Sequence, residues 1–307
     1  MTLAACGGGA REYRAAPFDA PVLAAETPGE GRTERVLRAA GGDTLALTRW
    51  SAEAPRGAIL AVHGFGDYGP STYDGAAREW REAGLDVYAY DQRGFGRNPS
   101  RGDWPGAGRL VEDLAQVFAM VRAENPGLPL TVVGHSMGGA VVATALGEGR
   151  IAPERAVLLA PALWGGKHLG VFYRVLAGAA VTLAPDRRWT GDGIVRIRAS
   201  DNDEALLALA RDPLYLRYPS SREFAGLVAI MDRAVEAAPA IATPTLVIYG
   251  ANDEVVPEEP LRETTALFAG PKEFRRIGTG WHLLLRDLEG RTVRDAVAVY
   301  ALGGGTP

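Results

Sequence analysis

The sequence predicts an α/β protein in which a mostly parallel central sheet is covered by helices on both faces. Three observations predict this fold class. Short apolar runs typical of strands alternate along the chain with segments of helical periodicity. Two of these runs, residues 58–62 and 130–133, are almost continuously apolar, as strands buried on both faces are. The 307 residues are 47% hydrophobic, which is enough to bury one large core as a single domain with an insertion.

Each predicted element has a local reason. Two early strands flank a Gly-Gly-Asp turn at 41–43, and the later strands are apolar runs bounded by turn residues. The predicted strands are 35–39, 44–50, 58–62, 86–90, 130–133, 156–160, 244–249 and 273–277. The predicted helices, in which apolar residues recur at helical spacing, are 71–83, 108–123, 139–146, 258–269 and 290–301.

Two parts of the chain fall outside this alternation. Residues 1–33 are rich in Ala, Pro, Gly and Glu and predict an extended N-terminal arm. Residues 161–242 contain no convincing strand, and we expect them to form a helical cap inserted into a body made of 34–160 and 243–307. Helical patterns within the cap cover 171–183, 203–209 and 221–237.

A G-x-S-x-G motif at residues 134–138 lies between a predicted strand and a predicted helix. In that position the motif is typical of a nucleophile elbow, a tight turn that lifts the hydroxyl of Ser136 above the sheet edge. Side chains in place of Gly134 or Gly138 would collide with the neighbouring backbone. The N-terminal N–H groups of the following helix point at whatever the serine attacks.

A serine nucleophile needs a base and a carboxylate that orients the base, and after such an elbow the chain order is Ser, acid, His. His282 is the one histidine that follows a suitable acid. Asp253 comes just after the apolar run 244–249, and its short side chain suits a turn, whereas Glu254 is expected to be a solvated neighbour. The sequence therefore predicts Ser136, Asp253 and His282 as the catalytic residues.

The other histidines and one further acid have structural explanations. His135 lies inside the elbow with its side chain expected to point away from the serine, His63 ends a strand, and His168 lies in the predicted cap. Asp91 also follows a strand, but residues 91–96 predict a turn held by an Asp–Arg interaction.

Ester hydrolysis places negative charge on the carbonyl oxygen, so two backbone N–H donors are expected near the serine. One is predicted from Met137, the first residue of the elbow helix. The second is predicted from Phe65, because Gly64 and Gly66 allow the loop after strand 58–62 to turn inward. The alternative is a glycine turn shaped only by packing.

Composition excludes several function classes. The net charge is −4 and no basic run indicates nucleic-acid binding. The single cysteine excludes an internal disulfide framework and a cysteine-based metal site, and the four histidines are too scattered for a zinc motif. We therefore expect no metal and no cofactor. The longest apolar stretch, 169–185, carries Arg174 and is too short to span a bilayer.

The N-terminus resembles the end of a bacterial lipoprotein signal. The residues Leu-Ala-Ala-Cys at 3–6 match a lipobox and precede a Gly-rich tether, so Cys6 is a candidate for lipidation. The basic and apolar regions of a signal peptide do not precede it. We expect a cell-envelope lipoprotein, with possible membrane association through Cys6, if the start of the chain is truncated. The alternative is a cytoplasmic protein with an Ala/Gly leader.

From about Arg35 to the C-terminus, the chain resembles the α/β-hydrolase superfamily of serine hydrolases, in its monoacylglycerol lipase and lysophospholipase branch. The motifs that carry the resemblance are His63-Gly64-Phe65-Gly66 with Tyr68, 91–96, 134–139, Gly250-Ala251-Asn252-Asp253, Gly280-Trp281-His282 and Asp212-Pro213-Leu214 in the cap. In the family a histidine occupies the position of Gln92. The resemblance implies a cofactor-free esterase that acts on a lipid or other small-molecule ester in which a single acyl chain is attached to glycerol or a similar alcohol. The three catalytic residues predict that the reaction passes through an acyl-enzyme.

Several alternatives stay open at this point. The same three residues could serve a short-chain carboxylesterase, or a perhydrolase or acyltransferase in which another group attacks the acyl-enzyme. A non-catalytic binding protein with a hydrolase fold is a more distant alternative. The cap is expected to line an acyl pocket with the apolar residues Leu169, Val171, Phe172, Val175 and Leu176, unless these only pack the cap onto the body.

Overall fold

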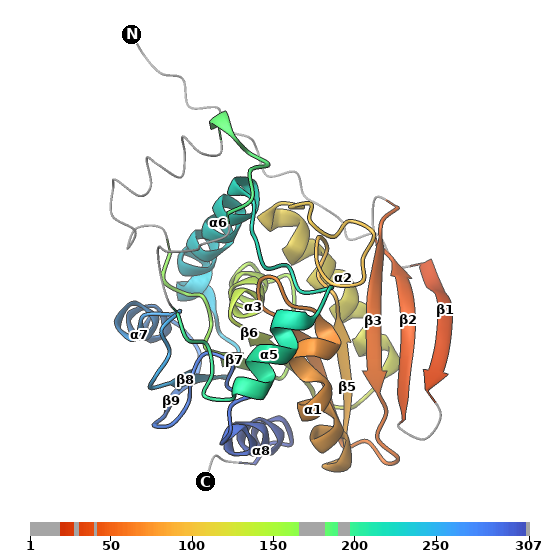
Figure 1. Cartoon of the computed structure of the whole chain (residues 1–307). Helices are drawn as coiled ribbons and strands as arrows, with labels where there is room; N and C mark the ends of the chain where they lie inside the picture. The colour runs from red at the N-terminus through yellow and green to blue at the C-terminus, as the bar shows by residue number, and fades with distance from the viewer. Residues whose placement is uncertain (1–18, 28–30, 40–41, 166–181, 190–196, 305–307) are drawn as a thin grey trace.

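The computed structural model describes residues 19–27, 31–39, 42–165, 182–189 and 197–304. In these parts of the chain, one nine-stranded sheet forms the centre of the molecule, in the order β1-β2-β3-β5-β4-β6-β7-β8-β9 (Figure 1). The strands are β1 (Asp19–Thr27), β2 (Arg32–Arg38), β3 (Thr44–Trp50), β4 (Gly57–Val62), β5 (Leu85–Tyr90), β6 (Leu130–His135), β7 (Arg155–Leu159), β8 (Thr245–Gly250) and β9 (Lys272–Ile277).

The sheet is antiparallel on one side and parallel on the other. The pairs β1–β2, β2–β3 and β3–β5 are antiparallel. All the remaining neighbours, from β5 through β4 to β9, are parallel. The central strands β4, β5, β6 and β8 are buried along their whole length, which explains why their sequences are mostly apolar. The edge strand β9 instead carries charged residues, which discourage pairing with another chain.

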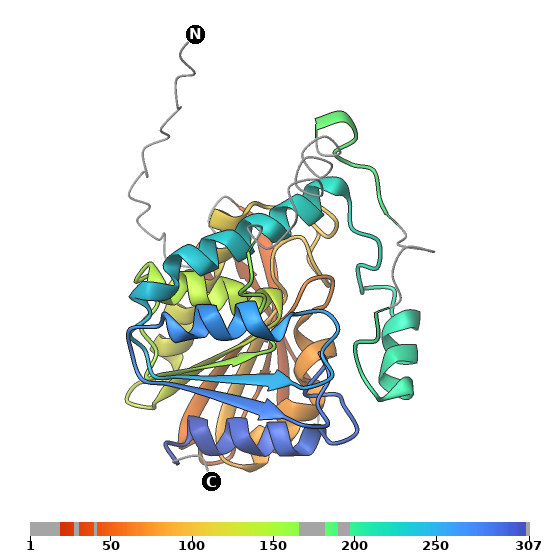
Figure 2. The ribbon, with the colours of Figure 1, turned by 90° about the vertical axis from the view of Figure 1, so that its left-hand side faces the viewer.

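Helices cover both faces of the sheet, which confirms the predicted fold class (Figure 2). The helices are α1 (Gly69–Glu82), α2 (Ala107–Glu124), α3 (Met137–Gly147), α5 (Asp203–Arg211), α6 (Ser221–Ala237), α7 (Glu258–Ala266) and α8 (Gly290–Ala301), with a short 3₁₀ turn at Ala238–Ala240. Residues of α1 and α8 join the core on one face, and residues of α2, α3, α6 and α7 join the core on the other.

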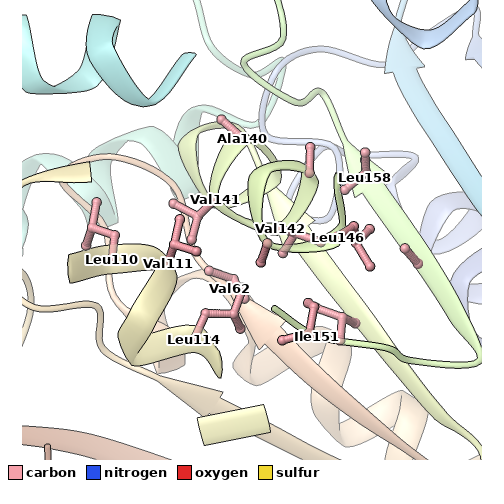
Figure 3. Close-up of a cluster of buried hydrophobic side chains, with 14 of the residues drawn as sticks. Val62, Leu110, Val111, Leu114, Ala140, Val141, Val142, Leu146, Ile151 and Leu158 are labelled. Carbon is pink, nitrogen blue, oxygen red and sulfur yellow. The ribbon is translucent and has the colours of Figure 1, made fainter. Parts of the chain in front are cut away.

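The larger core lies where α2 and α3 pack on β4. Figure 3 shows Leu110, Val111 and Leu114 of α2 gathered around Val62 of β4 and Val141 of α3. All five side chains are at most 2% exposed. Since interiors pack as densely as organic crystals, this core gives the strand end that carries Ser136 a rigid support.

The boundaries of the arm and of the cap differ from the sequence prediction. Asp19–Thr27, predicted within an extended arm, pairs antiparallel with β2 as strand β1. α6, predicted within the cap, lies against α3, so it belongs to the helical layer of the body. The reason is visible at Gly147 of α3, where any side chain would overlap the backbone of Ala237.

α5 stands apart from both helical layers. It lies beyond the carboxyl ends of the parallel strands, the side to which the arrowheads of β8 and β9 point in Figure 2. None of its residues is buried, and its N-cap Asn202 accepts a hydrogen bond from the Ala205 N–H. α5 therefore overhangs the edge of the sheet where the loops after β4, β6, β8 and β9 meet.

Candidate active site

Ser136 stands at the turn between β6 and α3 in a strained backbone conformation. Its φ is +51° and its ψ is −117°, a region that residues other than glycine rarely occupy. Backbone bonds on both sides hold it there: the Ser136 N–H donates to Leu159 O of β7 at 3.0 Å, and Ser136 O accepts from the Ala162 N–H at 3.0 Å. This is the geometry expected of a nucleophile elbow.

The glycines of the motif are required by close packing. A Cβ at Gly134 would lie 2.7 Å from Gly138 O, and a Cβ at Gly138 would overlap the carbonyl oxygens of Val62 and His63. The turn can therefore approach the end of β4 only because both positions lack a side chain.

His282 connects Ser136 to Asp253. Its Nε2 is 3.0 Å from Ser136 Oγ, and its Nδ1 is 2.8 Å from Asp253 Oδ2. The His282 side chain is 8% exposed and that of Asp253 is fully buried. The three residues come from loops after β6, β8 and β9, and they meet because the carboxyl ends of parallel strands lie at the same edge of the sheet.

The second oxygen of Asp253 is occupied by the backbone. Asp253 Oδ1 accepts the N–H groups of Val255 at 2.7 Å and Val256 at 2.9 Å, which fixes the plane of the carboxylate. Glu254 is exposed and accepts the backbone N–H of Arg198 at 2.7 Å instead. Asp253, and not Glu254, is thus the acid that contacts His282.

The His135 side chain is bonded to the backbone of His282. Its Nε2 donates to His282 O at 3.0 Å, and the two rings lie 5.0 Å apart. Burial, together with the neighbouring His282, lowers the pKa of His135 to about 3. His135 is therefore neutral at physiological pH and ties the elbow to the β9 loop, by which we mean residues 278–289.

The β4 loop, residues 63–68, lies against the elbow. A Cβ at Gly64 would be 3.2 Å from Ser136 Cβ, and Gly66 has a φ of +78° that favours glycine. The Met137 N–H opens α3 and so has no partner within the helix. Within the described part of the chain, the Phe65 N–H has no hydrogen-bond partner either. Both amides are available to an oxygen bound beside the serine.

His63 and Gln92 hold the start of the β4 loop. The Gln92 N–H donates to His63 Nε2 at 2.8 Å, and the Gln92 side-chain amide donates to His63 O at 2.7 Å. His63 Nδ1 donates in turn to Gly64 O at 2.8 Å. Full burial lowers the pKa of His63, in keeping with this neutral tautomer.

The turn after β5 is held by an Asp–Arg interaction, as the sequence predicts. The arginine is Arg97, whose Nε is 2.9 Å from Asp91 Oδ2, one residue beyond the predicted motif. Arg93, inside the motif, binds the buried Asp113 at 2.9 Å. Asp91 also accepts the Gly69 N–H at 3.0 Å and is fully occupied by structural bonds.

The cap contacts the site at both ends of α5. Before the helix, Ala199 O accepts the Leu283 N–H at 2.9 Å, and Asn202 donates to Arg286 O at 2.9 Å. After the helix, the Leu216 N–H donates to Gly66 O at 2.8 Å. These contacts attach the cap to the β9 loop and to the β4 loop.

A side-chain bond strengthens the second of these attachments. The Tyr68 hydroxyl donates to Asp212 Oδ2 at 2.8 Å, and burial followed by this bond raises the pKa of Tyr68. Both residues occur in motifs that the sequence singles out, but nothing in the spacing pairs them. Their contact is a site feature that sequence reasoning missed.

Some predicted residues lie outside the described residues. They are the cap residues Leu169, Val171, Phe172, Val175 and Leu176, and Cys6 near the N-terminus. In the described ranges there is no group of three or more His, Cys, Asp and Glu side chains that could hold a metal ion. None of the described helices combines the length and apolar character needed to cross a membrane.

A family model described as serine aminopeptidase, S33, matches residues 53–289. The chain belongs to this family. This confirms the α/β-hydrolase resemblance predicted from the motifs, and the S33 match spans all the loops that form the site.

Relatives of this S33 family member include lipases. The monoacylglycerol lipase of Mycolicibacterium smegmatis is 28% identical over 280 residues, which cover 88% of this chain and 96% of that protein. Human monoglyceride lipase is 27% identical over 221 residues, covering 70% of this chain and 72% of that protein.

Solved structures share the fold. The crystal structure of Paleococcus ferrophilus monoacylglycerol lipase superposes with a TM-score of 0.72 at 22% identity, covering 84% of this chain and 98% of that chain. A soluble variant of Saccharomyces cerevisiae monoglyceride lipase, in complex with a substrate analogue, gives a TM-score of 0.71 at 17% identity. The match covers 94% of this chain and 97% of that chain. At these identities the structures support the α/β-hydrolase fold.

Proposed function

We propose that this chain is a serine ester hydrolase of the monoacylglycerol-lipase type, which cleaves the ester of a single acyl chain through an acyl-enzyme. The observation that carries the proposal is the bonded series Asp253–His282–Ser136 at 2.8 and 3.0 Å. The lipases that match this chain along most of their length support the ester class.

In the proposed mechanism, Ser136 Oγ attacks the ester carbonyl while His282 Nε2 takes its proton. Asp253 accepts the Nδ1–H, keeps the imidazole in the correct tautomer and stabilises the imidazolium. The Phe65 and Met137 amides stabilise the oxyanion. His282 gives the proton to the departing alcohol. It then takes a proton from the water that attacks the acyl-enzyme. As the second tetrahedral intermediate collapses, His282 returns this proton to Ser136 Oγ and the carboxylic acid is released.

The first prediction tests the nucleophile. Ser136→Ala removes the attacking oxygen, so hydrolysis of a p-nitrophenyl ester should fall by about 10³-fold or more. Covalent labelling by a fluorophosphonate probe should disappear, while the circular dichroism spectrum and thermal midpoint stay close to those of the unaltered protein. Ester hydrolysis that survives in this variant would contradict the assignment of Ser136.

A substrate panel tests the acyl class. It contains p-nitrophenyl esters of two to sixteen carbons, a monoacylglycerol, lysophosphatidylcholine and, because of the family's description, an aminoacyl p-nitroanilide. We expect the highest kcat/KM on a monoacylglycerol or a long-chain ester. Preference for the shortest esters would indicate a short-chain carboxylesterase, and cleavage of the anilide alone would indicate a peptidase. Adding hydrogen peroxide or an alcohol would detect a perhydrolase or an acyltransferase by its product.

A further inference from the structure

An ion pair joins the two loops on either side of Ser136. Arg286 lies in the β9 loop, four residues after His282, and Asp67 lies in the β4 loop, two residues after Phe65. Arg286 Nη2 is 2.5 Å from Asp67 Oδ2. The two residues are 219 positions apart in the sequence, so no local turn sets their relative position.

Asp67 is buried, Arg286 is partly buried, and both make further hydrogen bonds. Asp67 is 3% exposed, and the Arg286 side chain is 17% exposed. Asp67 Oδ1 accepts the Tyr68 N–H at 2.9 Å, so the carboxylate also braces its own loop. The other Arg286 nitrogen, Nη1, is 3.3 Å from Ser71 O and 3.4 Å from Ser71 Oγ, at the start of α1.

The electrostatics favour the charged form of Asp67. Burial alone would raise the pKa of the Asp67 carboxyl, but the Arg286 guanidinium and the hydrogen bonds from Ser71 and Tyr68 outweigh it, so the pKa lies below its ordinary value. The ion pair is therefore present at neutral pH. Arg286 contacts Asp67 through Nη2 and Ser71 through Nη1, so its planar guanidinium is held in direction as well as in distance.

We propose that Arg286 is a positioning residue, which uses its ion pair with Asp67 to hold the β4 loop in register with His282. The proposal rests on the proposed function, because Phe65 in the β4 loop is the predicted oxyanion donor and His282 the predicted base. The Phe65 N–H has to bond the oxygen of the same carbonyl group whose carbon is attacked by Ser136, and His282 activates that serine. A displacement of about 1 Å between such groups can cost about 10²-fold in rate.

The chain offers a matched control in Arg294 of α8. Its side chain is 19% exposed and its Nε is 2.8 Å from Glu79 Oε2. Arg294 Nη1 donates to Leu285 O at 2.7 Å, so it supports the same β9 loop as Arg286. Neither of these hydrogen-bond partners belongs to the β4 loop. Arg294→Met therefore tests the loss of a partly buried arginine while the ion pair between Arg286 and Asp67 is kept.

The experiment compares Arg286→Met, Arg286→Lys and Arg294→Met on the p-nitrophenyl ester that the unaltered protein cleaves best. All are assayed well below their thermal midpoints. For Arg286→Met we expect kcat to fall about 10- to 100-fold with KM within about threefold, because a misplaced oxyanion donor weakens the transition state more than the bound substrate. Arg286→Lys should recover part of kcat, and Arg294→Met should stay within about threefold of the unaltered protein.

Two further measurements separate positioning from stability. The double variant Asp67→Asn/Arg286→Met should regain thermal stability relative to Arg286→Met, since no uncompensated charge stays buried, yet kcat should stay low. Amide hydrogen exchange over residues 64–68 should be faster in Arg286→Met and unchanged in Arg294→Met.

Three results would overturn the proposal: equal loss of kcat in Arg286→Met and Arg294→Met, recovery of kcat together with stability in the double variant, or unchanged exchange over 64–68. Failure of the proposed function would look different. The unaltered protein itself would then leave every ester intact and Ser136 unlabelled, whichever residue stood at position 286.

Discussion

Two adjacent carboxylates after β8 have different hydrogen-bond partners, although both are suited to orient a histidine. Asp253 is buried, with one oxygen on His282 and the other on two backbone N–H groups. Glu254 is exposed and its longer side chain binds the backbone of Arg198. The shorter acid fits inside its own turn, because an Asp side chain reaches the N–H groups two and three residues ahead.

A pair of isosteric substitutions tests this difference. In Asp253→Asn the remaining carbonyl oxygen should face the Val255 and Val256 N–H groups, which leaves the side-chain NH₂ facing His282 Nδ1. The imidazole then adopts the wrong tautomer and cannot accept the Ser136 proton, so kcat should fall about 10⁴-fold. Glu254→Gln should stay within about threefold of the unaltered protein in the same p-nitrophenyl ester assay. Equal effects of the two changes would contradict the assignment of the acid.

At the scale of elements, α5 is attached to the site by its two flanking segments and not by its own face. No residue of α5 is buried, yet residues 199–202 bind the β9 loop and residues 212–216 bind the β4 loop. The cap therefore contributes to the placement of the loops that carry Phe65 and His282.

Tyr68→Phe tests the second attachment. The change removes a hydrogen bond to the Asp212 carboxylate, a type that contributes about 1.5–3 kcal/mol, from a half-buried site. We expect hydrogen exchange over 212–216 to be about 10- to 100-fold faster, kcat/KM for a long-chain ester to fall about three- to tenfold, and the thermal midpoint to fall by a few degrees. Tyr218→Phe, an exposed tyrosine on the same segment, is the control. An equal effect in the control would argue against an attachment through Tyr68.

At the scale of the whole molecule, the fold buries two neutral histidines in its core. His63 is fully buried and His135 is 5% exposed, and burial lowers the pKa of both. An unfolded histidine has a pKa of about 6.5, so at lower pH the unfolded chain binds more protons than the folded one. The stability that these neutral histidines contribute is fully present above about pH 6.5 and is lost as the pH falls. For His135 the loss continues down to about pH 3.

This linkage gives a prediction for acid unfolding. Between pH 6.5 and 4.5, His135→Gln should reduce the slope of the free energy of unfolding against pH by up to about 1.4 kcal/mol per pH unit, because one buried histidine contributes that much. Gln keeps an N–H donor for His282 O. Urea unfolding at a series of pH values measures the slope. Burial raises the pKa values of Asp113 and Asp287, so these two groups make the folded state more stable as the pH falls. Both proteins contain them, so the difference in slope between the unaltered protein and His135→Gln reports His135 alone. Parallel curves would contradict the prediction.

Much of the fold and the candidate site follows from local sequence. The buried strands are continuous apolar runs, and α8 begins and ends at the residues predicted for it. α3 begins at Met137, which the elbow motif predicts as the first residue of its helix. The glycines at 134 and 138 are needed for the same close approach of backbones that the motif implies. The predictions that concern Cys6 and the acyl-pocket residues of the cap stay predictions.

The sequence by itself determined the α/β alternation, the elbow at Ser136 and the chain order of Ser136, Asp253 and His282, because these depend on periodicity, turn chemistry and chain order. Only the tertiary structure decided that Asp91 binds Arg97, that Tyr68 meets Asp212 and that Asp67 pairs with Arg286. The last two contacts join residues 144 and 219 positions apart. At such separations a charged or polar side chain has many partners of suitable chemistry, and the packing of the loops at the sheet edge selects one of them.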